Sequence, residues 1–422
     1  IAPHRWPPAG ARGHIDQALD AYEAVHANLV VHDPRYPAPA TLRALVRDGN
    51  LIDAGDRREP TPGSDLIARV LLDHEPGIVV AQAWGGLNTI ARALMSIEER
   101  YAGTSEWPAV QERISRRTVL TAWGEQDDAF AEYIRPHWPD LEFRQVATAA
   151  WGYAARWVTP PESHAYLSAE WTRENVSSAG PVGAAYRVWG DGLQMAEGFD
   201  PEDYFGLRDM TDDELRERGY QVFFPVEPAG AWISEGDTSN YALHIDNGLR
   251  NFEHPTFGGW GGRQEPHATD QRYWVSAGFR GLDLSGPPVD WGDVARWLPA
   301  FQRDFAARLR WSVTPSYAGA NHAPRVEVST GLDVDAEPGE VVTIRWVASD
   351  PDGDPVSVRP WQYREAGTLD AEVDLTRTGE DSLEVRIPAD ATPGTTAHVI
   401  LEATDEGEPP LTAYARIVLT VR

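Results

Sequence analysis

The sequence has 422 residues, a formal net charge of −28, 42 % hydrophobic residues and no cysteine. A chain of this length suits two or three domains of roughly 100 to 200 residues each, with enough apolar residues for substantial cores. The excess of 65 acidic over 37 basic residues disfavours nucleic acid polymers as partners, because binding a phosphate backbone needs clustered cations. The lack of cysteine excludes disulfides, thiolate nucleophiles and Cys-ligated zinc, but it does not decide the cellular compartment.

The sequence also carries no apolar run near the roughly 20 residues that cross a bilayer, and it does not open on a charged segment followed by an apolar one. We therefore expect a soluble protein without a membrane span. The 17 Trp and 14 Tyr residues are flat side chains that can stack on sugar rings, although core and interface packing accounts for most tryptophans in any protein.

Helix and strand patterns alternate over the first 150 residues. Three segments have helical spacing: 14–33, 40–49 and 64–74. Two short apolar strands, 78–84 and 118–123, are each followed by a turn and a helix, and a third strand-like run follows at 141–147. This alternation predicts an α/β domain in which a mostly parallel sheet is covered by flanking helices.

The remaining sequence predicts loops, a closing helix and a second domain. Segment 151–230 is punctuated by Pro and Gly and is interpreted as decoration around the ligand edge of the sheet, and a helix at 292–310 closes the domain. Alternating strands separated by short turns follow. We expect an α/β domain at residues 1–315 and an independent antiparallel β-sandwich at residues 323–422.

The sandwich contains one acidic turn, "SDPDGDPVS", with Asp350, Asp352 and Asp354 at alternate positions. This spacing fits either a calcium-binding loop, because carboxylates are the ligands that calcium prefers, or an ordinary solvated Asp/Gly turn.

Two motifs follow the predicted parallel strands, at the edge of the sheet where ligands bind in such folds. "AWGGLN" places Trp84 at the end of one strand and Asn88 at the start of the next helix, where Asn88 contacts a ligand or only caps the helix. "WGEQDD" places Glu125, Asp127 and Asp128 at a helix N-terminus, either as a substrate or metal site or as partners of the helix dipole.

A third cluster, "SEGDT", contributes Glu235 and Asp237, two residues apart. If the three clusters converge, the cleft has the carboxylates needed to bind a hard cation or to act as acid and base in glycosidic cleavage. Glycines at 258, 259, 261 and 262 surround Trp260, so we expect its ring to be exposed and to stack on a sugar. A serine hydrolase is disfavoured because the sequence has no G-x-S-x-G elbow.

The motifs "AWGGLNTIARAL", "GEQDDAFAEYIRPHWPDL", "EGDTSNYALHIDNGLRNFEHPTFGGWGGR" and "ASDPDGDPVSVRPWQYREAG" resemble, in order and spacing, a bacterial family described as cellulose-binding proteins. Its members have a nucleoside-hydrolase-like N-terminal domain and an immunoglobulin-like or cadherin-like C-terminal sandwich. The resemblance covers essentially the whole chain. It implies a sugar-handling protein, usually exported, so we expect a secreted or periplasmic location.

Nucleoside hydrolases hold calcium in a nest of aspartates, and the family normally begins with a strand and an Asp-Asp loop that form most of that nest. This sequence opens on "IAPHRWPP", which looks like the segment after the family's second strand, so the first strand and its acidic loop are expected to be missing. By analogy the resemblance makes Asp237 a candidate metal ligand, with calcium as the candidate cofactor. It makes Glu235 and Asp127 candidates for the acid or base.

The resemblance also implies sugar contacts, which add to those suggested by the strand ends. The candidate substrate-binding residues are Trp84, Asn88, Asp128, Asn247, Trp260 and Arg263. Two hypotheses remain open: a glycoside hydrolase acting on a polysaccharide or oligosaccharide through a carboxylate-lined cleft, and a carbohydrate-binding protein that grips a glycan without cleaving it.

Overall fold

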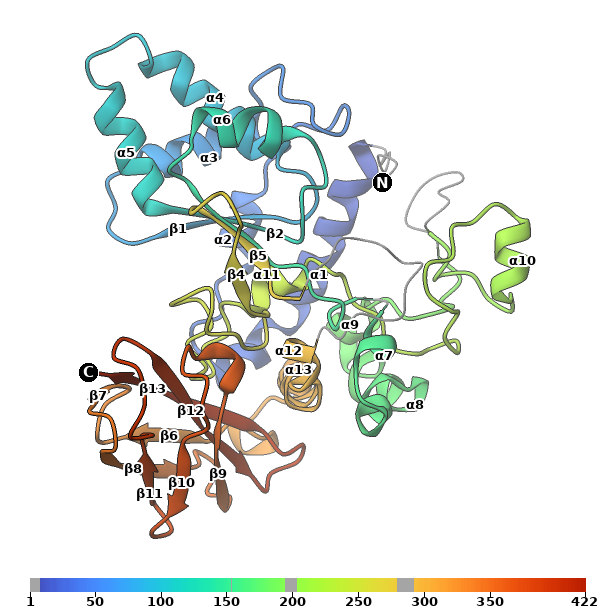
Figure 1. Ribbon diagram of the computed structural model, residues 1–422. Coiled ribbons are helices and arrows are strands. Elements are labelled where there is room, and N and C mark those ends of the chain that lie inside the picture. Colours follow the sequence, from blue (N-terminus) through green and yellow to red (C-terminus); the bar gives the residue numbers. More distant parts are fainter. Residues whose placement is uncertain (1–7, 153, 194–202, 279–291) are drawn as a thin grey trace.

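The computed structural model describes residues 8–152, 154–193, 203–278 and 292–422 (Figure 1). An α/β part built on one sheet is followed by an all-β part of two sheets. Within those ranges no helix combines the length and apolarity that crossing a bilayer would require.

The α/β part is built on a five-stranded sheet, here called sheet A, with strand order β1-β2-β3-β5-β4. Its strands are β1 Val79–Ala83, β2 Thr118–Ala122, β3 Glu142–Gln145, β5 Tyr273–Ser276 and β4 Gln264–Pro266. The first four are parallel to one another, and β4 is antiparallel to β5. The predicted strands at 78–84 and 118–123 are therefore neighbours in one sheet, which confirms the α/β prediction.

Amphipathic helices cover this sheet because their apolar residues recur at helical spacing. Figure 1 shows α3 Pro62–Leu72, α4 Asn88–Tyr101, α5 Trp107–Arg117 and α6 Arg135–His137 gathered on one side of it. Ile90, Leu94 and Ile97 of α4 pack with Leu120 and Phe143 of the sheet, and all five are buried.

Short helices occupy the long connection that follows β3. They are α7 Ala155–Val158, η2 Pro161–Leu167, α8 Ala169–Thr172, η3 Arg173–Ser177, α9 Gly180–Ala184, α10 Asp212–Glu217 and α11 Thr238–Ala242. The first long helix, α1 Pro8–His32, precedes α2 Pro39–Leu45 and packs against α13 Leu298–Val313. The closing helix predicted at 292–310 corresponds to α12 Gly292–Ala295 and α13.

The C-terminal part is the predicted β-sandwich, and its described strand pairs are antiparallel except for one parallel pair. One sheet has the order β10-β11-β8-β6 and the other β7-β13-β12-β9. Its strands are β6 Arg325–Val328, β7 Asp333–Ala336, β8 Val341–Ser349, β9 Val356–Gln362, β10 Asp374–Arg377, β11 Ser382–Arg386, β12 Thr396–Asp405 and β13 Thr412–Val421, with η4 Tyr317–Gly319 before them and η5 Arg364–Ala366 among them. Inward residues such as Ile344, Leu383, Leu401 and Ile417 form its core.

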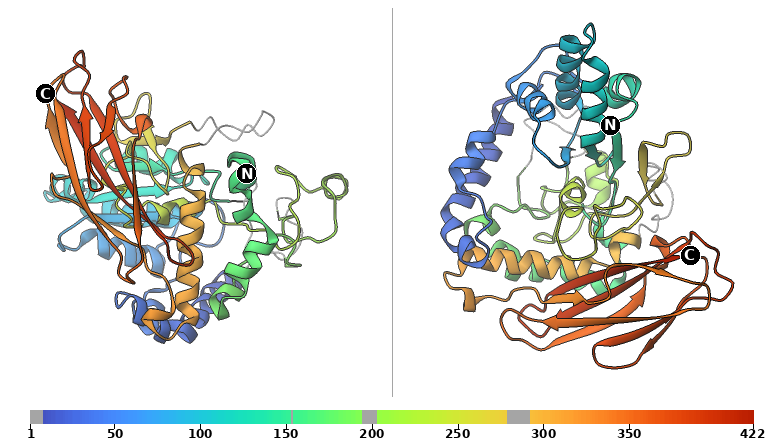
Figure 2. Two further views of the ribbon diagram at one scale, coloured as in Figure 1. Left: turned by 90° about the horizontal axis from the view of Figure 1, so that it is seen from below. Right: turned by 90° about the vertical axis from the view of Figure 1, so that its left-hand side faces the viewer.

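The two parts share a core, and independent folding of the sandwich stays a prediction. Ile400 and Tyr414 of the sandwich pack in one cluster with Trp260, Trp297 and Phe301 of the α/β part. Figure 2 (right) shows α13 running between the two parts. Strands β12 and β13 are thus covered on both faces: one by their own sandwich core and one by the α/β part.

A buried arginine fixes this contact. Arg416 of β13 is fully buried; its Nε donates to the Leu249 carbonyl at 2.6 Å, and its Nη2 donates to the Gly258 carbonyl at 2.8 Å. Its Nη1 lies 3.0 Å from Nδ1 of His398. Burial lowers the pKa of Arg416 to about 10 and that of His398 to about 3, so at neutral pH the arginine is charged and the histidine is a neutral acceptor.

A second junction joins α1, the linker and the acidic turn of the sandwich. His32 Nδ1 lies 3.0 Å from His322 Nε2, and His322 Nδ1 lies 3.0 Å from the Asp352 carboxylate. Asp350 accepts hydrogen bonds from the backbone amides of Asp352 and Asp354, which closes the turn locally. Oδ1 of Asp350 and the Asp352 carboxylate therefore have structural partners, as in an Asp/Gly turn, while Oδ2 of Asp350 is buried without a hydrogen-bond partner. Calcium binding by this turn stays a prediction.

The Arg416 contact gives a first prediction. Arg416→Lys keeps the charge but cannot reach both carbonyls with one ammonium group, so a buried carbonyl loses its donor. We expect the free energy of unfolding to fall by on the order of 3 kcal/mol. Chemical denaturation measures this, with the exposed Arg345 changed to Lys as the control. Equal stability of the two variants would show that Arg416 does not hold the junction.

Candidate functional site

A tryptophan follows the carboxyl end of each of the neighbouring strands β1 and β2. Ala83 and Ala122 are register partners in the parallel pair, and Trp84 and Trp123 are the next residues of each strand. Trp84 is 51 % exposed and Trp123 is half-buried. The edge of sheet A where ligands are expected therefore presents aromatic surface, and Trp84 stays a candidate sugar contact.

The short helix α11 is tied to this edge by three side chains. Asn240 is fully buried, and its Nδ2 donates to the Ala83 carbonyl at 3.2 Å, while Gln82 Nε2 donates to the Asn240 carbonyl at 3.1 Å. Ser239 Oγ donates to the carbonyl of Val146, the residue after β3. These contacts hold the "SEGDT" turn, which leads into α11, over the ends of β1 and β3.

Asp237 is the half-buried carboxyl group at the start of α11. Gln126 Nε2 lies 3.3 Å from both of its carboxylate oxygens. Burial raises the pKa of Asp237 to about 6; the Gln126 contact opposes the shift, the nearby Glu235 carboxylate adds to it, and a backbone hydrogen bond from Trp123 opposes it. Asp237 can therefore gain or lose a proton near neutral pH, as an acid or base catalyst must.

Glu235 and Asp237 are two predicted site residues that lie close enough to interact electrostatically. Glu235 is exposed to solvent, and its charge contributes to the raised pKa of Asp237. Two carboxyl groups in unlike environments form the arrangement from which acid and base roles are assigned.

Asp127 lies at the same edge, but its carboxylate is used structurally. Oδ2 accepts from the backbone amide of Asn88 at 3.0 Å, and Oδ1 accepts from that of Ala129 at 3.0 Å. The Asp127 carboxylate thus caps the N-termini of α4 and of the helix after β2. This agrees with the alternative in which the acids of "WGEQDD" interact with the helix dipole. Its chain neighbour Gln126, which is not among the residues predicted from the sequence, contacts Asp237 instead.

Asn88 and Asp128 also have structural partners. Asn88 Nδ2 donates to the carbonyls of Asn50 and Asp56 at 2.9 and 3.1 Å, which anchors the 50–56 loop rather than capping its own helix. Asp128 pairs with Arg57 at 2.7 Å. The expectation that Asn88 caps its own helix is therefore wrong, and Asp128 has an ion-pair partner. A sugar contact by either residue stays a prediction.

The expectation of an exposed Trp260 ring is wrong. Trp260 is 2 % exposed and packs against Phe301 and Tyr414 in the core shared by the two parts. The glycines around it allow close packing: a Cβ at Gly261 would lie 2.4 Å from the backbone nitrogen of Leu243, and one at Gly259 would lie 2.8 Å from the Asn251 side chain. These glycines let the loop pack closely against its neighbours and do not expose the Trp260 ring.

Asn247 and Arg263 lie at the junction with the sandwich. Asn247 Oδ1 accepts from the Leu249 amide at 3.0 Å, and its carbonyl accepts from the Tyr414 amide at 2.8 Å. Arg263 lies close enough to Glu365 to help lower the pKa of that carboxyl group. The glycine-rich segment therefore contacts the sandwich, while the "SEGDT" turn before it lies at the edge of sheet A.

A calcium nest is not evident around Asp237. Among the residues that the structure describes, no group of three or more His, Asp or Glu side chains comes together to hold a metal ion. The Asp237 carboxylate instead faces the Gln126 amide, whose N–H groups a cation would displace or reorient. Calcium at Asp237 stays a prediction, and no step proposed below depends on it.

Comparison with known proteins agrees with this architecture. A nucleoside hydrolase-related hypothetical protein from Saccharophagus degradans, described as associated with carbohydrate metabolism, superposes with a TM-score of 0.71 at 23 % identity, over 97 % of this chain and 88 % of that one. At this identity the likeness shows a common fold. Protocadherin gammaB7 matches 24 % of each chain at 18 % identity with a TM-score of 0.18, too low to support any inference. No curated protein matches the sequence.

Two family descriptions cover the two parts. Residues 4–264 match "Cellulose-binding Sde182, nucleoside hydrolase-like domain", and residues 342–421 match "Cellulose-binding protein Sde0182, C-terminal domain". The fold is nucleoside-hydrolase-like with a C-terminal all-β part, as the sequence resemblance predicted. The chain belongs to the family of Sde182-type cellulose-binding proteins with a nucleoside hydrolase-like domain.

Proposed function

We propose that this protein binds a polysaccharide or oligosaccharide at the carboxyl edge of sheet A and hydrolyses a glycosidic bond there. The observation that carries the proposal is Asp237: a half-buried carboxyl group with a pKa near 6, beside Glu235. Membership in a cellulose-binding family supports a glycan as the partner.

Trp84 and Trp123 would bind the sugar. Trp84 Nε1 donates to Gln82 Oε1 at 3.0 Å, and Gln82 also bonds to α11, so the exposed ring has a fixed orientation relative to Asp237. An aromatic ring that is already held in place loses little conformational entropy when a sugar stacks on it. This would present a glycosidic oxygen to the adjacent carboxyl groups.

Asp237 would act as the general acid. In its protonated form it donates a proton to the leaving glycosidic oxygen, while the exposed Glu235 carboxylate removes a proton from the water molecule that attacks the anomeric carbon. The Gln126 amide would then stabilise the Asp237 carboxylate left after proton transfer, because its Nε2 faces both oxygens. Exchange with solvent then returns the proton held by Glu235 to Asp237, which restores both groups.

The second candidate is glycan binding without cleavage. It is favoured by Asp127, whose two oxygens are occupied by backbone amides and are not directed to a substrate. In that case Asp237 and Gln126 would recognise sugar hydroxyl groups. We also propose, from the family resemblance, that the protein is exported to meet its polymer.

Asp237→Asn separates the two candidates. Asn is close in shape to Asp and can still accept from Gln126, but it cannot transfer a proton, so we expect glycan cleavage to fall at least about 100-fold with binding retained. The measurement is reducing-end release from a panel of glycans, with binding of the same glycans by calorimetry. Asp390→Asn, at an exposed position of the sandwich, is the control. A wild-type protein that binds a glycan and releases no product would decide for the binding protein.

The raised pKa of Asp237 also predicts that the stability difference between Asp237→Asn and the wild type depends on pH. The folded protein holds the Asp237 proton up to a pH of about 6, whereas an unfolded aspartate loses it near pH 4. Ionising the buried carboxyl therefore destabilises the fold as pH rises from 4 to 6 and remains unfavourable above 6. Asp237→Asn should stabilise the protein by about 1 to 3 kcal/mol at pH 8 and by much less at pH 4. Thermal unfolding at both pH values checks this, and a gain of equal size at both would contradict the assignment.

A further inference from the structure

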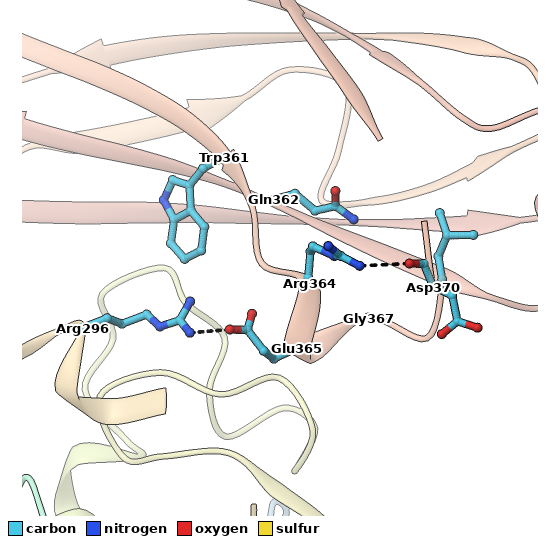
Figure 3. Close-up of a pocket in the computed structure, with 8 residues that line it drawn as sticks. Arg296, Trp361, Gln362, Arg364, Glu365, Gly367 and Asp370 are labelled. Atoms are coloured by element: carbon cyan, nitrogen blue, oxygen red, sulfur yellow. Dashed lines mark hydrogen bonds and ion pairs between the residues drawn. The ribbon is translucent and has the colours of Figure 1, made fainter. Parts of the chain in front are cut away.

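A cavity lies at the junction of the two parts, and none of its lining residues belongs to the carboxyl edge of sheet A. It has a volume of about 580 Å³ and is lined by Arg296, Trp361, Gln362, Arg364, Glu365, Gly367, Leu369 and Asp370 (Figure 3). Arg296 follows α12 in the α/β part, and the other residues belong to β9, η5 and the loop after them. The volume falls within the range of about 300 to 1,000 Å³ typical of small-molecule sites.

Trp361 forms an aromatic wall of this groove, with its ring pointing toward Arg296 (Figure 3). Its Nε1 donates to Glu402 Oε2 at 3.1 Å, and Glu402 is also paired with Arg359 at 2.7 Å. The Trp361 ring is half-buried, and its centroid lies 5.7 Å from the centroid of the Trp297 ring. The guanidinium groups of Arg296 and Arg359 each lie 5.9 Å from the centre of the Trp361 ring. A sugar that stacks on this ring therefore displaces an arginine side chain, while the indole keeps its position.

The polar groups of the groove are balanced in charge. Arg296 pairs with Glu365 at 2.5 Å across the two parts of the molecule. Arg364 pairs with Glu372 at 2.9 Å and donates to the Asp370 carbonyl at 3.0 Å, and the Asp370 side chain is exposed on the rim. Two guanidinium groups and two carboxylates therefore line the groove, offering both donors and acceptors without a net charge.

Partial burial raises the pKa of Glu365, but the hydrogen bond from Arg296 and the nearby charges of Arg296 and Arg263 outweigh it, so the pKa lies below its usual value. Glu365 thus remains a carboxylate, which can accept hydrogen bonds from hydroxyl groups. Arg263, which the sequence analysis expected to bind a sugar, lies beside this groove.

We propose that this groove is a second glycan-binding site, one that takes an uncharged polysaccharide chain. The inference rests on the proposed function, since it adds a binding surface to a protein that acts on glycans. A sugar ring stacks on Trp361, and its hydroxyl groups exchange hydrogen bonds with Arg296, Glu365 and Asp370.

Two features favour an uncharged polymer over an acidic one. The groove has no net positive charge to attract uronate or sulfate groups, and the whole chain carries a formal charge of −28, which repels polyanions. The cavity is an open groove rather than an enclosed pocket, so a chain can run through it. A sugar bound here would touch both parts of the molecule at once.

The test measures binding of the full chain to three probes: microcrystalline cellulose, soluble hydroxyethylcellulose and polygalacturonate. The groove variants are Trp361→Ala and Asp370→Ala. Trp157→Ala, a 42 % exposed tryptophan on α7, and Asp390→Ala are matched controls, and Trp84→Ala reports on the sheet edge. Asp370 lies on the exposed rim and its backbone carbonyl is kept, so this variant probes the groove even if Trp361→Ala lowers stability.

We expect Trp361→Ala to bind the two cellulose probes on the order of tenfold more weakly and Asp370→Ala roughly threefold more weakly, with both controls unchanged. Wild-type binding by both groove variants would overturn the inference, and a loss in Trp84→Ala alone would leave the proposed function intact. If the wild type bound polygalacturonate more tightly than the cellulose probes, the proposal that the groove takes an uncharged polysaccharide would be wrong. A wild type that binds none of the three probes would count against the proposed function as well.

Discussion

The contact between β13 and the glycine-rich segment 247–263 is the constraint on which the rest of the structure depends. Arg416 is a charged side chain with no exposed surface, and the carbonyls of Leu249 and Gly258 accept its hydrogen bonds. A buried cation is tolerated only when its donors are satisfied, so those two carbonyls must lie where they do. The hydrogen bonds of Arg416 therefore fix both the path of segment 247–263 and the docking of the sandwich on it.

The Arg416 contact also affects the candidate site, because segment 247–263 follows α11 in the chain. Asp237 lies ten residues before segment 247–263, and that segment contains Trp260. α11 is tied to the ends of β1 and β3 through Asn240 and Ser239, while the following segment is locked under the sandwich. The molecule therefore presents two polar surfaces held by one segment: the edge of sheet A, with a titratable carboxyl, and the groove at the junction of the two parts.

The sequence predicted what depends on local pattern. Continuous apolar runs located β1 and β2 to within one or two residues, and the polar residues after them were correctly expected at one edge of the sheet. Tertiary contacts decided the rest. Alternation in β13 marks Arg416 as a solvent-facing residue, and only the docked α/β part buries it. The glycines around Trp260 suggested exposure but serve close packing, and nothing in the sequence distinguished Gln126 from the acids beside it.

The central claim is that Asp237 is a titrating group inside a glycan site. Its pKa can be measured directly by NMR of a protein labelled at the aspartate carboxyl carbons, with Asp237→Asn used to assign the signal. The account predicts a pKa near 6 in the free protein and a shift of that titration when a cello-oligosaccharide is added. A pKa near 4 that does not respond to any glycan would contradict it.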